Sequence, residues 1–188
     1  MPDDRLMQRT QSILSRLPAG PCAMAEVGVW VGLLSEQLLR RHDALTLYMV
    51  DAYREVPEGH PYRLSGSVIA TYTQEQMDAA MAEAEARTRF ARDRAPRWRM
   101  DSLRAAAQMA EGALMLAYID AAHDYDSVKA DIEAWLPAVG RGGWIGGHDY
   151  GHPKQGAVRD AVNDWRRAFN VRARLEVDGG MSWFWRVR

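Results

Sequence analysis

Residues 114–150 read LMLAYIDAAHDYDSVKADIEAWLPAVGRGGWIGGHDY, and this stretch decides the fold. One apolar run ends at Asp120, and a second, glycine-rich run ends at His148 and Asp149. A helical pattern lies between them, so the stretch has the length of one strand–helix–strand unit, about 30 residues. Such a crossover is right-handed and makes the two strands parallel, which brings both carboxyl ends to one edge of the sheet. Open α/β sheets bind ligands at that edge. Four side chains should therefore meet there, those of Asp120, His123, His148 and Asp149.

The rest of the chain continues this alternation of strands and helices. Helices are predicted from Asp3 or Asp4 to Leu17 and over Leu33–Arg41, Gln74–Arg92, Leu103–Met109, Ser127–Val139 (with Gly140–Gly142 as its C-cap) and Gln155–Phe169. Strands are predicted over Cys22–Val27, Leu45–Val50, Arg97–Met100, Leu114–Ile119 and Gly142–Gly147, with a hairpin of Val171–Val177 and Met181–Val187. We therefore expect one α/β domain over residues 1–188, a Rossmann-like, doubly wound and mostly parallel sheet with a C-terminal antiparallel hairpin and helices on both faces.

The composition excludes several functional classes. The formal net charge is −1, so the chain lacks the basic balance that favours nucleic acid or an anionic membrane. Its one cysteine, Cys22, allows neither an internal disulfide nor a cysteine-rich zinc site. Residues 1–17 lack the apolar core of a signal peptide, and no run approaches the roughly 20 apolar residues of a spanning helix. We expect a cytoplasmic protein whose partners are small molecules.

A glycine turn joins the first predicted strand to the next helix. It reads EVGVWVG from Glu26 to Gly32. A dinucleotide fingerprint needs glycine where Trp30 and Leu33 stand, because the second glycine lets the backbone approach a pyrophosphate. Asp51 ends the next strand 51 − 28 = 23 positions after Gly28, a spacing that suits ribose hydroxyls. These residues predict an adenosine-like ligand without a pyrophosphate at this turn.

Several segments together carry a family resemblance. They are AEVGVWVG (25–32), MVDAY (49–53), MDS (100–102), residues 118–150 and GAVRDAV (156–162). They resemble the class I S-adenosylmethionine-dependent methyltransferases, and more narrowly the bacterial group that includes sugar O-methyltransferases of the macrocin type. The resemblance covers about Ala25 to Val162 and implies a mostly parallel sheet with one reversed strand near its edge. It also implies transfer of a methyl group to an oxygen of a small hydroxylated acceptor, such as a glycoside or another natural product.

The resemblance also implies a set of cofactor-binding residues. Glu26, Gly28 and Gly32 would lie along the methionine part of S-adenosylmethionine, with Glu26 near its amino group. Asp51 would hold the ribose hydroxyls. Trp30 departs from the glycine-rich pattern and could either cover the cofactor or pack inward. The remaining cofactor-binding candidates are Tyr53, Asp101, Ser102 and Asp120, of which Asp101 and Ser102 would flank the adenine.

The predicted reaction centre has more than one interpretation. A hydroxyl acceptor needs a base or a metal ion that lowers its pKa. His123 could be the base, because an imidazole titrates near neutral pH. Alternatively, it is a surface histidine, and Asp120 and Asp149 only bind backbone N–H groups at strand ends.

The resemblance also implies a divalent metal ion, magnesium or manganese, held by Asp120, His148 and Asp149. An acid after the first of the two strands and a pair of adjacent ligands after the second are expected in metal-dependent O-methyltransferases. His148 departs from that pattern, because magnesium prefers hard oxygen ligands whereas imidazole suits manganese, iron, nickel or zinc. His148 could instead be a second base or contact the acceptor.

An irregular segment at residues 52–73 interrupts the alternation. It contains four Gly or Pro residues and interleaved tyrosines, and such long loops are often lids. With Tyr53 and Tyr62 it would close over the acceptor, although a plain surface loop explains it too. The amphipathic first helix, within residues 1–20, could mediate a homodimer. The alternative functions are a nicotinamide-dependent oxidoreductase and a non-catalytic protein that binds an adenosine ligand.

Overall fold

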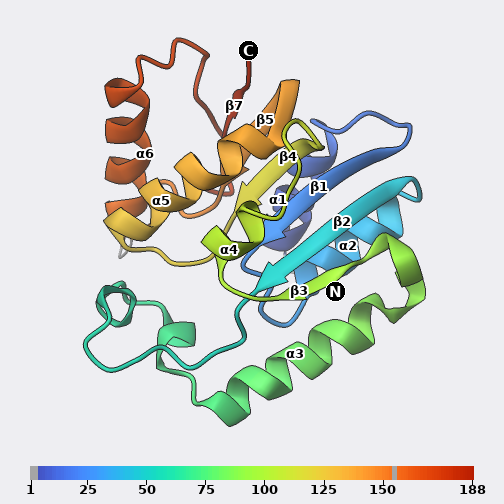
Figure 1. The fold of residues 1–188 in the computed structure, drawn as a ribbon, viewed down its shortest axis with the longest axis vertical. Helices are drawn as coiled ribbons and strands as arrows, with labels where there is room; N and C mark the ends of the chain where they lie inside the picture. The colour runs from blue at the N-terminus through green and yellow to red at the C-terminus, as the bar shows by residue number, and fades with distance from the viewer. Residues whose placement is uncertain (1–3, 154–155) are drawn as a thin grey trace.

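The computed structural model describes residues 4–153 and 156–188, and these build around one seven-stranded sheet (Figure 1). The strand order is β3-β2-β1-β4-β5-β7-β6; β1 to β5 are parallel, and β7 runs antiparallel to both β5 and β6. The strands are β1 (Cys22–Val27), β2 (Leu45–Asp51), β3 (Arg97–Arg99), β4 (Leu114–Ile119), β5 (Val139–Gly147), β6 (Glu176–Val177) and β7 (Trp183–Arg186). The predicted mostly parallel, Rossmann-like sheet with an antiparallel end is confirmed.

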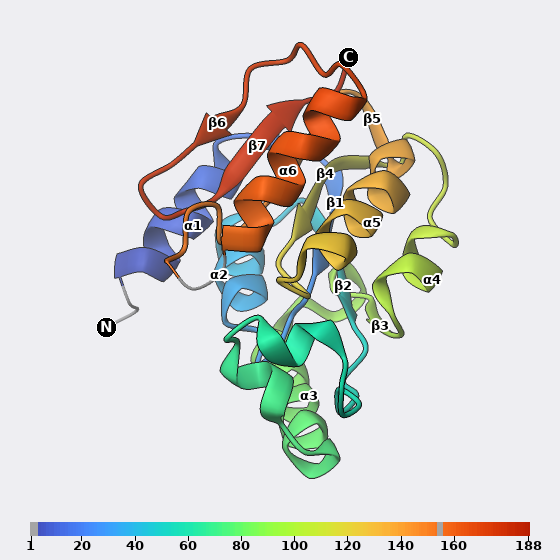
Figure 2. The same cartoon turned by 90° about the vertical axis from the view of Figure 1, so that its left-hand side faces the viewer.

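Helices cover both faces of this sheet (Figures 1 and 2). They are α1 (Asp4–Leu14), α2 (Leu33–Arg41), α3 (Gln74–Thr88), α4 (Ser102–Ala106), α5 (Tyr125–Trp135) and α6 (Gly156–Ala168). α1, α2 and α3 share one buried cluster with the sheet, to which Ile13, Leu38 and Ala84 contribute. α4, α5 and α6 pack on the opposite face in two further clusters.

The central strands are apolar because both of their faces are covered. Along β1, Met24 packs with the α1–α3 side, whereas Ala25 and Val27 pack with the other side. This is the period of two that an extended chain imposes. Near the centre, β1 and β4 are buried over most of their length.

The registers bring three strand ends level with one another. Val27 pairs with Ile119, and Ile119 pairs with Gly147. The next residues along each strand, Gly28, Asp120 and His148, therefore lie side by side at the carboxyl edge. Main-chain hydrogen bonds hold them there, from Asp120 N to Val27 O at 2.7 Å and from His148 N to Ile119 O at 3.0 Å. This edge carries the candidate site.

The predicted C-cap at Gly140–Gly142 is wrong. α5 ends at Trp135, a 3₁₀ turn spans Leu136–Ala138, and β5 already begins at Val139. Pro137 explains the early end, since it has no N–H to donate to the carbonyl four residues back, although Leu136 itself keeps a helical backbone. Gly140 and Gly143 belong to the strand instead: a Cβ at Gly143 would lie 2.8 Å from Met115 O, so glycine lets β5 run close to β4.

Other boundaries shift at helix ends and in the hairpin. α1 ends at Leu14 instead of Leu17, and α3 ends at Thr88, followed by a 3₁₀ segment, Arg89–Arg94. α4 begins at Ser102 because Asp101 caps it, accepting from Arg104 N at 2.9 Å. The hairpin strands are shorter than predicted, β6 most of all. The predicted starts at Asp3 and Gln155 lie outside the described residues. Among the described helices, none has the length and apolarity needed to cross a bilayer.

Candidate active site

The turn after β1 depends on glycine at position 28. Gly28 has φ +92°, and a methyl group there would collide with the main-chain carbonyl of Asp120. Its N–H donates to Val50 O at 2.8 Å. A backbone without a side chain is therefore required where the ends of β1, β2 and β4 meet.

Asp51 fastens this turn from the end of β2. Its Oδ2 accepts from Val29 N at 2.9 Å and from Trp30 N at 3.0 Å, and its Oδ1 accepts from Tyr53 N at 2.9 Å. The Tyr53 hydroxyl in turn donates to Trp30 O at 2.9 Å. The carboxylate is thus fixed by main-chain donors before any ligand binds, while Oδ1, which accepts one hydrogen bond, retains a lone pair for a further donor.

A cavity of about 440 Å³ opens beside this turn. Seven of the nine predicted cofactor residues line it: Gly28, Trp30, Asp51, Tyr53, Asp101, Ser102 and Asp120. Trp30 is 37% exposed and lines the cavity, so of its two interpretations the structure places it on the cavity side. Glu26 and Gly32 do not line it.

Glu26 lies behind the cavity wall, where it is 2% exposed. The Ser35 hydroxyl on α2 donates to its Oε2 at 2.6 Å. Burial raises the pKa of Glu26 to about 8, although the bond from Ser35 acts in the opposite direction. A carboxyl held this way at the end of β1 can become ionised when a cation arrives.

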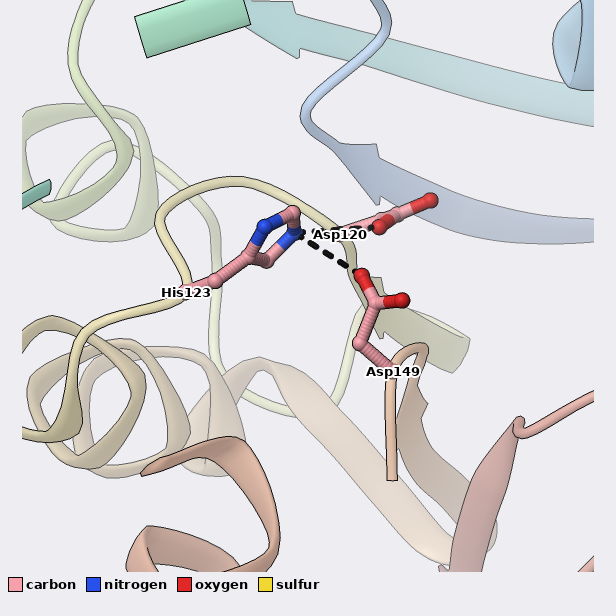
Figure 3. A group of neighbouring side chains, drawn as sticks. All are labelled: Asp120, His123 and Asp149. Atoms are coloured by element: carbon pink, nitrogen blue, oxygen red, sulfur yellow. Dashed lines mark ion pairs between the residues drawn. The ribbon is translucent and has the colours of Figure 1, made fainter. Parts of the chain in front are cut away.

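Three side chains that follow β4 and β5, those of Asp120, His123 and Asp149, meet at the end of the cavity that Asp120 lines (Figure 3). His123 Nε2 lies 3.1 Å from Asp149 Oδ2 and 3.5 Å from Asp120 Oδ1. Burial alone would raise the pKa of Asp120, but Arg9 and the imidazoles of His123 and His148 outweigh burial, so this pKa lies below its usual range. Burial would lower the pKa of His123, yet the hydrogen bond to Asp120 and the two carboxylates raise it. The imidazole is thereby prepared to hold a proton.

His148 joins the same cluster and also contacts Arg9. Its Nδ1 lies 3.2 Å from Asp149 Oδ1, and its Nε2 lies 2.9 Å from Gly180 O. Arg9 Nη2 lies 2.9 Å from Nε2 and 3.2 Å from Nδ1, so each ring nitrogen faces both an acceptor and the guanidinium. The group whose ligand atoms all lie within 4.8 Å of one another consists of Asp120, His123 and Asp149. It shares two members with the predicted metal set and has His123 in the place of His148.

Two charged residues of the site were absent from the sequence prediction. Arg9 on α1 donates from Nη1 to Asp120 Oδ2 at 2.7 Å. Asp131 on α5 lines the cavity beside Ser102, and burial raises its pKa to about 7. A common signal could have found both, because each is a charged residue on the apolar face of its helix. Arg9 lies between Leu6 and Ile13, and Asp131 lies between Val128 and Trp135.

The loop of residues 52–73 reaches this site from the other side. It contains two 3₁₀ turns, Pro61–Leu64 and Val68–Thr71. The ring of Tyr62 packs edge-on against the imidazole of His123, with 5.8 Å between centroids. Tyr62 and His60 also line the cavity. The loop therefore contacts both the cavity and the imidazole.

A family model described as a methyltransferase domain matches residues 25–150, which is more than half of the chain. The chain belongs to the methyltransferase domain family. The resemblance to class I S-adenosylmethionine-dependent methyltransferases is thereby confirmed, and S-adenosylmethionine is the methyl donor of that family. The nicotinamide-dependent alternative gains no support. No curated protein matches this methyltransferase in sequence.

Solved structures share its fold at low sequence identity. The O-methyltransferase NovP is 20% identical, with a TM-score of 0.63, over 97% of this chain and 79% of that one. CalS11, a calicheamicin methyltransferase, is 17% identical, with a TM-score of 0.67, over 96% and 77%. A protein from Corynebacterium glutamicum is 17% identical, with a TM-score of 0.67, over 100% and 83%. At these identities the likeness establishes the methyltransferase fold alone.

Proposed function

We propose that this methyltransferase transfers the methyl group of S-adenosylmethionine to a hydroxyl oxygen of a small molecule, with a glycoside or another polyhydroxylated natural product as the favoured acceptor. The observation that carries the proposal is the position of His123 Nε2 between two carboxylates, next to the end of the cavity at Asp120. The O-methyltransferase activity in the name of NovP supports the oxygen acceptor.

The residues around the cavity fit S-adenosylmethionine. The turn at Gly28 lacks the glycines that a pyrophosphate needs, and the Asp51 carboxylate is already fixed where ribose hydroxyls would donate to it. Asp101 and Ser102 would flank the adenine. Glu26 would pair with the amino group of the methionine part. The cofactor supplies a methyl group on a positively charged sulfur. The carbon of this methyl group is electrophilic without further activation.

His123 would serve as the base. With the Nε2 proton held by the carboxylates, the acceptor hydroxyl would give its proton to the other ring nitrogen, Nδ1, while its oxygen forms the new bond to the methyl carbon and the carbon–sulfur bond breaks. Asp120 and Asp149 orient the imidazole and stabilise the imidazolium that forms, because both face Nε2. The oxygen of the acceptor would lie close to these carboxylates, and the 52–73 loop would close over it through Tyr62.

A divalent ion is an alternative way to activate the same hydroxyl. Asp120, His123 and Asp149 would hold it, and two carboxylates with one imidazole suit manganese better than magnesium. Such an ion lowers the pKa of a bound hydroxyl. His123 would then be a ligand, so the two arrangements exclude each other at that residue.

The direct test is methyl transfer from radiolabelled S-adenosylmethionine to a panel of glycosides, phenols, amines and carboxylates. We expect label in hydroxylated acceptors and a product ether that resists mild base. Label recovered only in amines or carboxylic esters would contradict the proposed acceptor class. Binding of the cofactor without transfer to any acceptor would favour the non-catalytic alternative.

A further inference from the structure

Arg9 is a permanent cation in hydrogen-bond contact with a carboxylate of the reaction centre, that of Asp120. Its Nη1 lies 2.7 Å from Asp120 Oδ2, and its Nη2 lies 2.9 Å from His148 Nε2 and 3.2 Å from His148 Nδ1. The side chain is 22% exposed. A guanidinium stays charged at any working pH, so the pair places a permanent positive charge against a carboxylate of the proposed base and metal site.

The position of Arg9 is fixed by the packing of α1. Thr10 and Ile13, on the same helix, are completely buried, and Ile13 belongs to the cluster beneath the sheet. Two turns further on, Arg16 pairs with Glu176 at 2.7 Å and stacks over Phe184, which ties this end of the segment to the hairpin. Arg9 is therefore held in place by contacts that do not involve the reaction centre.

Arg9 offsets part of the negative charge of Asp120 and Asp149 before any metal ion binds. A divalent ion on Asp120 would share that carboxylate with the guanidinium, and like charges on one ligand repel each other. Removing Arg9 would leave two carboxylates and two imidazoles, a donor set that attracts a divalent ion much more strongly.

We propose that Arg9 is the resident cation of the reaction centre: it positions Asp120 and His148 and competes with divalent ions for the Asp120 carboxylate. Arg9 is a positioning residue that acts through these two side chains. The N-terminal helix thus sets how strongly the site binds metal. This inference rests on the proposed role of Asp120, His123 and Asp149 as the site of activation.

The test is a manganese titration, followed by the loss of the signal of free Mn²⁺ in electron paramagnetic resonance. We expect Arg9→Gln to lower the Kd for Mn²⁺ by about tenfold or more, whereas Arg9→Lys, which keeps the charge, stays within about threefold of the unmodified protein. Arg16→Gln is the matched control, because it removes a positive charge from the same segment away from the cluster, and its Kd should not change.

A second uncharged variant, Arg9→Met, keeps the aliphatic stem and serves if Arg9→Gln does not fold. Unchanged or weaker Mn²⁺ binding in both uncharged variants would overturn the inference. An equal increase in Mn²⁺ affinity in Arg9→Lys and in the uncharged variants would also overturn it, because the charge would then not matter. A purely structural role would lower Tm in all three variants and leave Mn²⁺ affinity unaltered. The Kd for S-adenosylmethionine, measured on the same samples, separates this outcome from failure of the proposed function, since Arg9 does not line the cavity.

Discussion

At the end of β2, the carboxylate that faces the cavity is held by main-chain N–H groups, whereas at the ends of β4 and β5 charged side chains contact one another. Asp51 accepts three backbone N–H groups. His123, by contrast, lies between two carboxylates, one of which pairs with Arg9. We call the first region the cofactor half (Gly28, Trp30, Asp51, Tyr53, Asp101 and Ser102) and the second the charged cluster (Arg9, Asp120, His123, His148 and Asp149).

The two regions differ in how they respond to substitution. A carboxylate held by backbone donors keeps its position when neighbouring side chains change, so the cofactor half is a preformed receptor. In the charged cluster, each side chain depends on the charge of the next, because burial raises the pKa of an unpaired carboxyl and lowers that of an unpaired imidazole. A single substitution there changes the chemistry without changing the fold.

His123→Ala should give the largest difference between the effect on turnover and the effect on cofactor binding. Loss of the base should lower kcat by a factor of about 10² to 10⁴. The Kd for S-adenosylmethionine should stay within about threefold, because His123 does not line the cavity. His42→Ala is the control, since His42 contacts Pro18 O at the opposite edge of the sheet. Equal losses of cofactor binding and turnover in His123→Ala would show that the two regions are not separable.

Gly28→Ala should damage both regions at once, because this glycine is where they touch. A methyl group at φ +92° meets the Asp120 carbonyl, so we expect the free energy of unfolding to fall by about 3 kcal/mol or more. Gly59→Ala is matched in backbone conformation, with φ +80° and open space around the new methyl, and should cost only about 1 kcal/mol. Denaturant unfolding of both variants measures the difference. Equal losses of unfolding free energy would show that the contact with the Asp120 carbonyl is not the cause.

Glu26 should release a proton when S-adenosylmethionine binds. The free carboxyl, with its pKa at about 8, is mostly protonated at pH 7, and an ammonium placed beside it favours the ionised form. Binding should therefore release about one proton at pH 7, and affinity should rise by up to about tenfold per pH unit until pH 8 and then level off. Calorimetry in buffers of different ionisation enthalpy measures the proton.

Glu26→Gln provides the control for this proton. It should abolish the release, and the affinity should become independent of pH over the same range. The other charged groups that act on Glu26 are Asp120, Arg9 and Asp51, which remain in place. Proton release that persists in Glu26→Gln would assign it to one of these and contradict the predicted contact with the amino group.

Tyr62→Ala should have the smallest effect, confined to the acceptor. Loss of its edge-on contact with His123 should lower kcat/KM for the acceptor by a factor of about 3 to 10, as an aromatic pair of this kind stabilises by about 0.5–1.5 kcal/mol. Tyr62→Phe keeps the ring and should stay within about twofold. If the phenylalanine variant loses as much as the alanine variant, the hydroxyl, which lies 3.2 Å from Ser67 Oγ, carries the effect instead.

The cofactor half could be predicted from sequence because its parts are local. A strand, a glycine turn, a helix and an acid at the end of the next strand follow in order, and Gly28, Trp30 and Asp51 line the cavity. Asp101 and Ser102, which the family resemblance implied, line it as well. Asp120, His123, His148 and Asp149 could be brought together for a related reason, since the crossover rule places both strand ends at one edge.

Arg9 could not be found in this way. It lies 111 positions from Asp120 in the sequence, and only the packing of α1 on the sheet brings the two together. The misplaced end of α5 has a local cause, since Pro137 lacks the N–H that would continue the helix toward the glycines. The cytoplasmic location and the homodimer stay predictions.

We propose that residues at the ends of β1–β3 bind the cofactor, whereas residues at the ends of β4 and β5 carry out methyl transfer. Calorimetric titration of S-adenosylmethionine into Asp51→Ala and Asp149→Ala tests it most directly, because each removes one carboxylate from one region. We predict that Asp51→Ala raises the Kd by about 10- to 100-fold, as the loss of charge-assisted hydrogen bonds implies, and that Asp149→Ala leaves it within about threefold. An unchanged Kd in Asp51→Ala, or equal losses in the two variants, would contradict the claim.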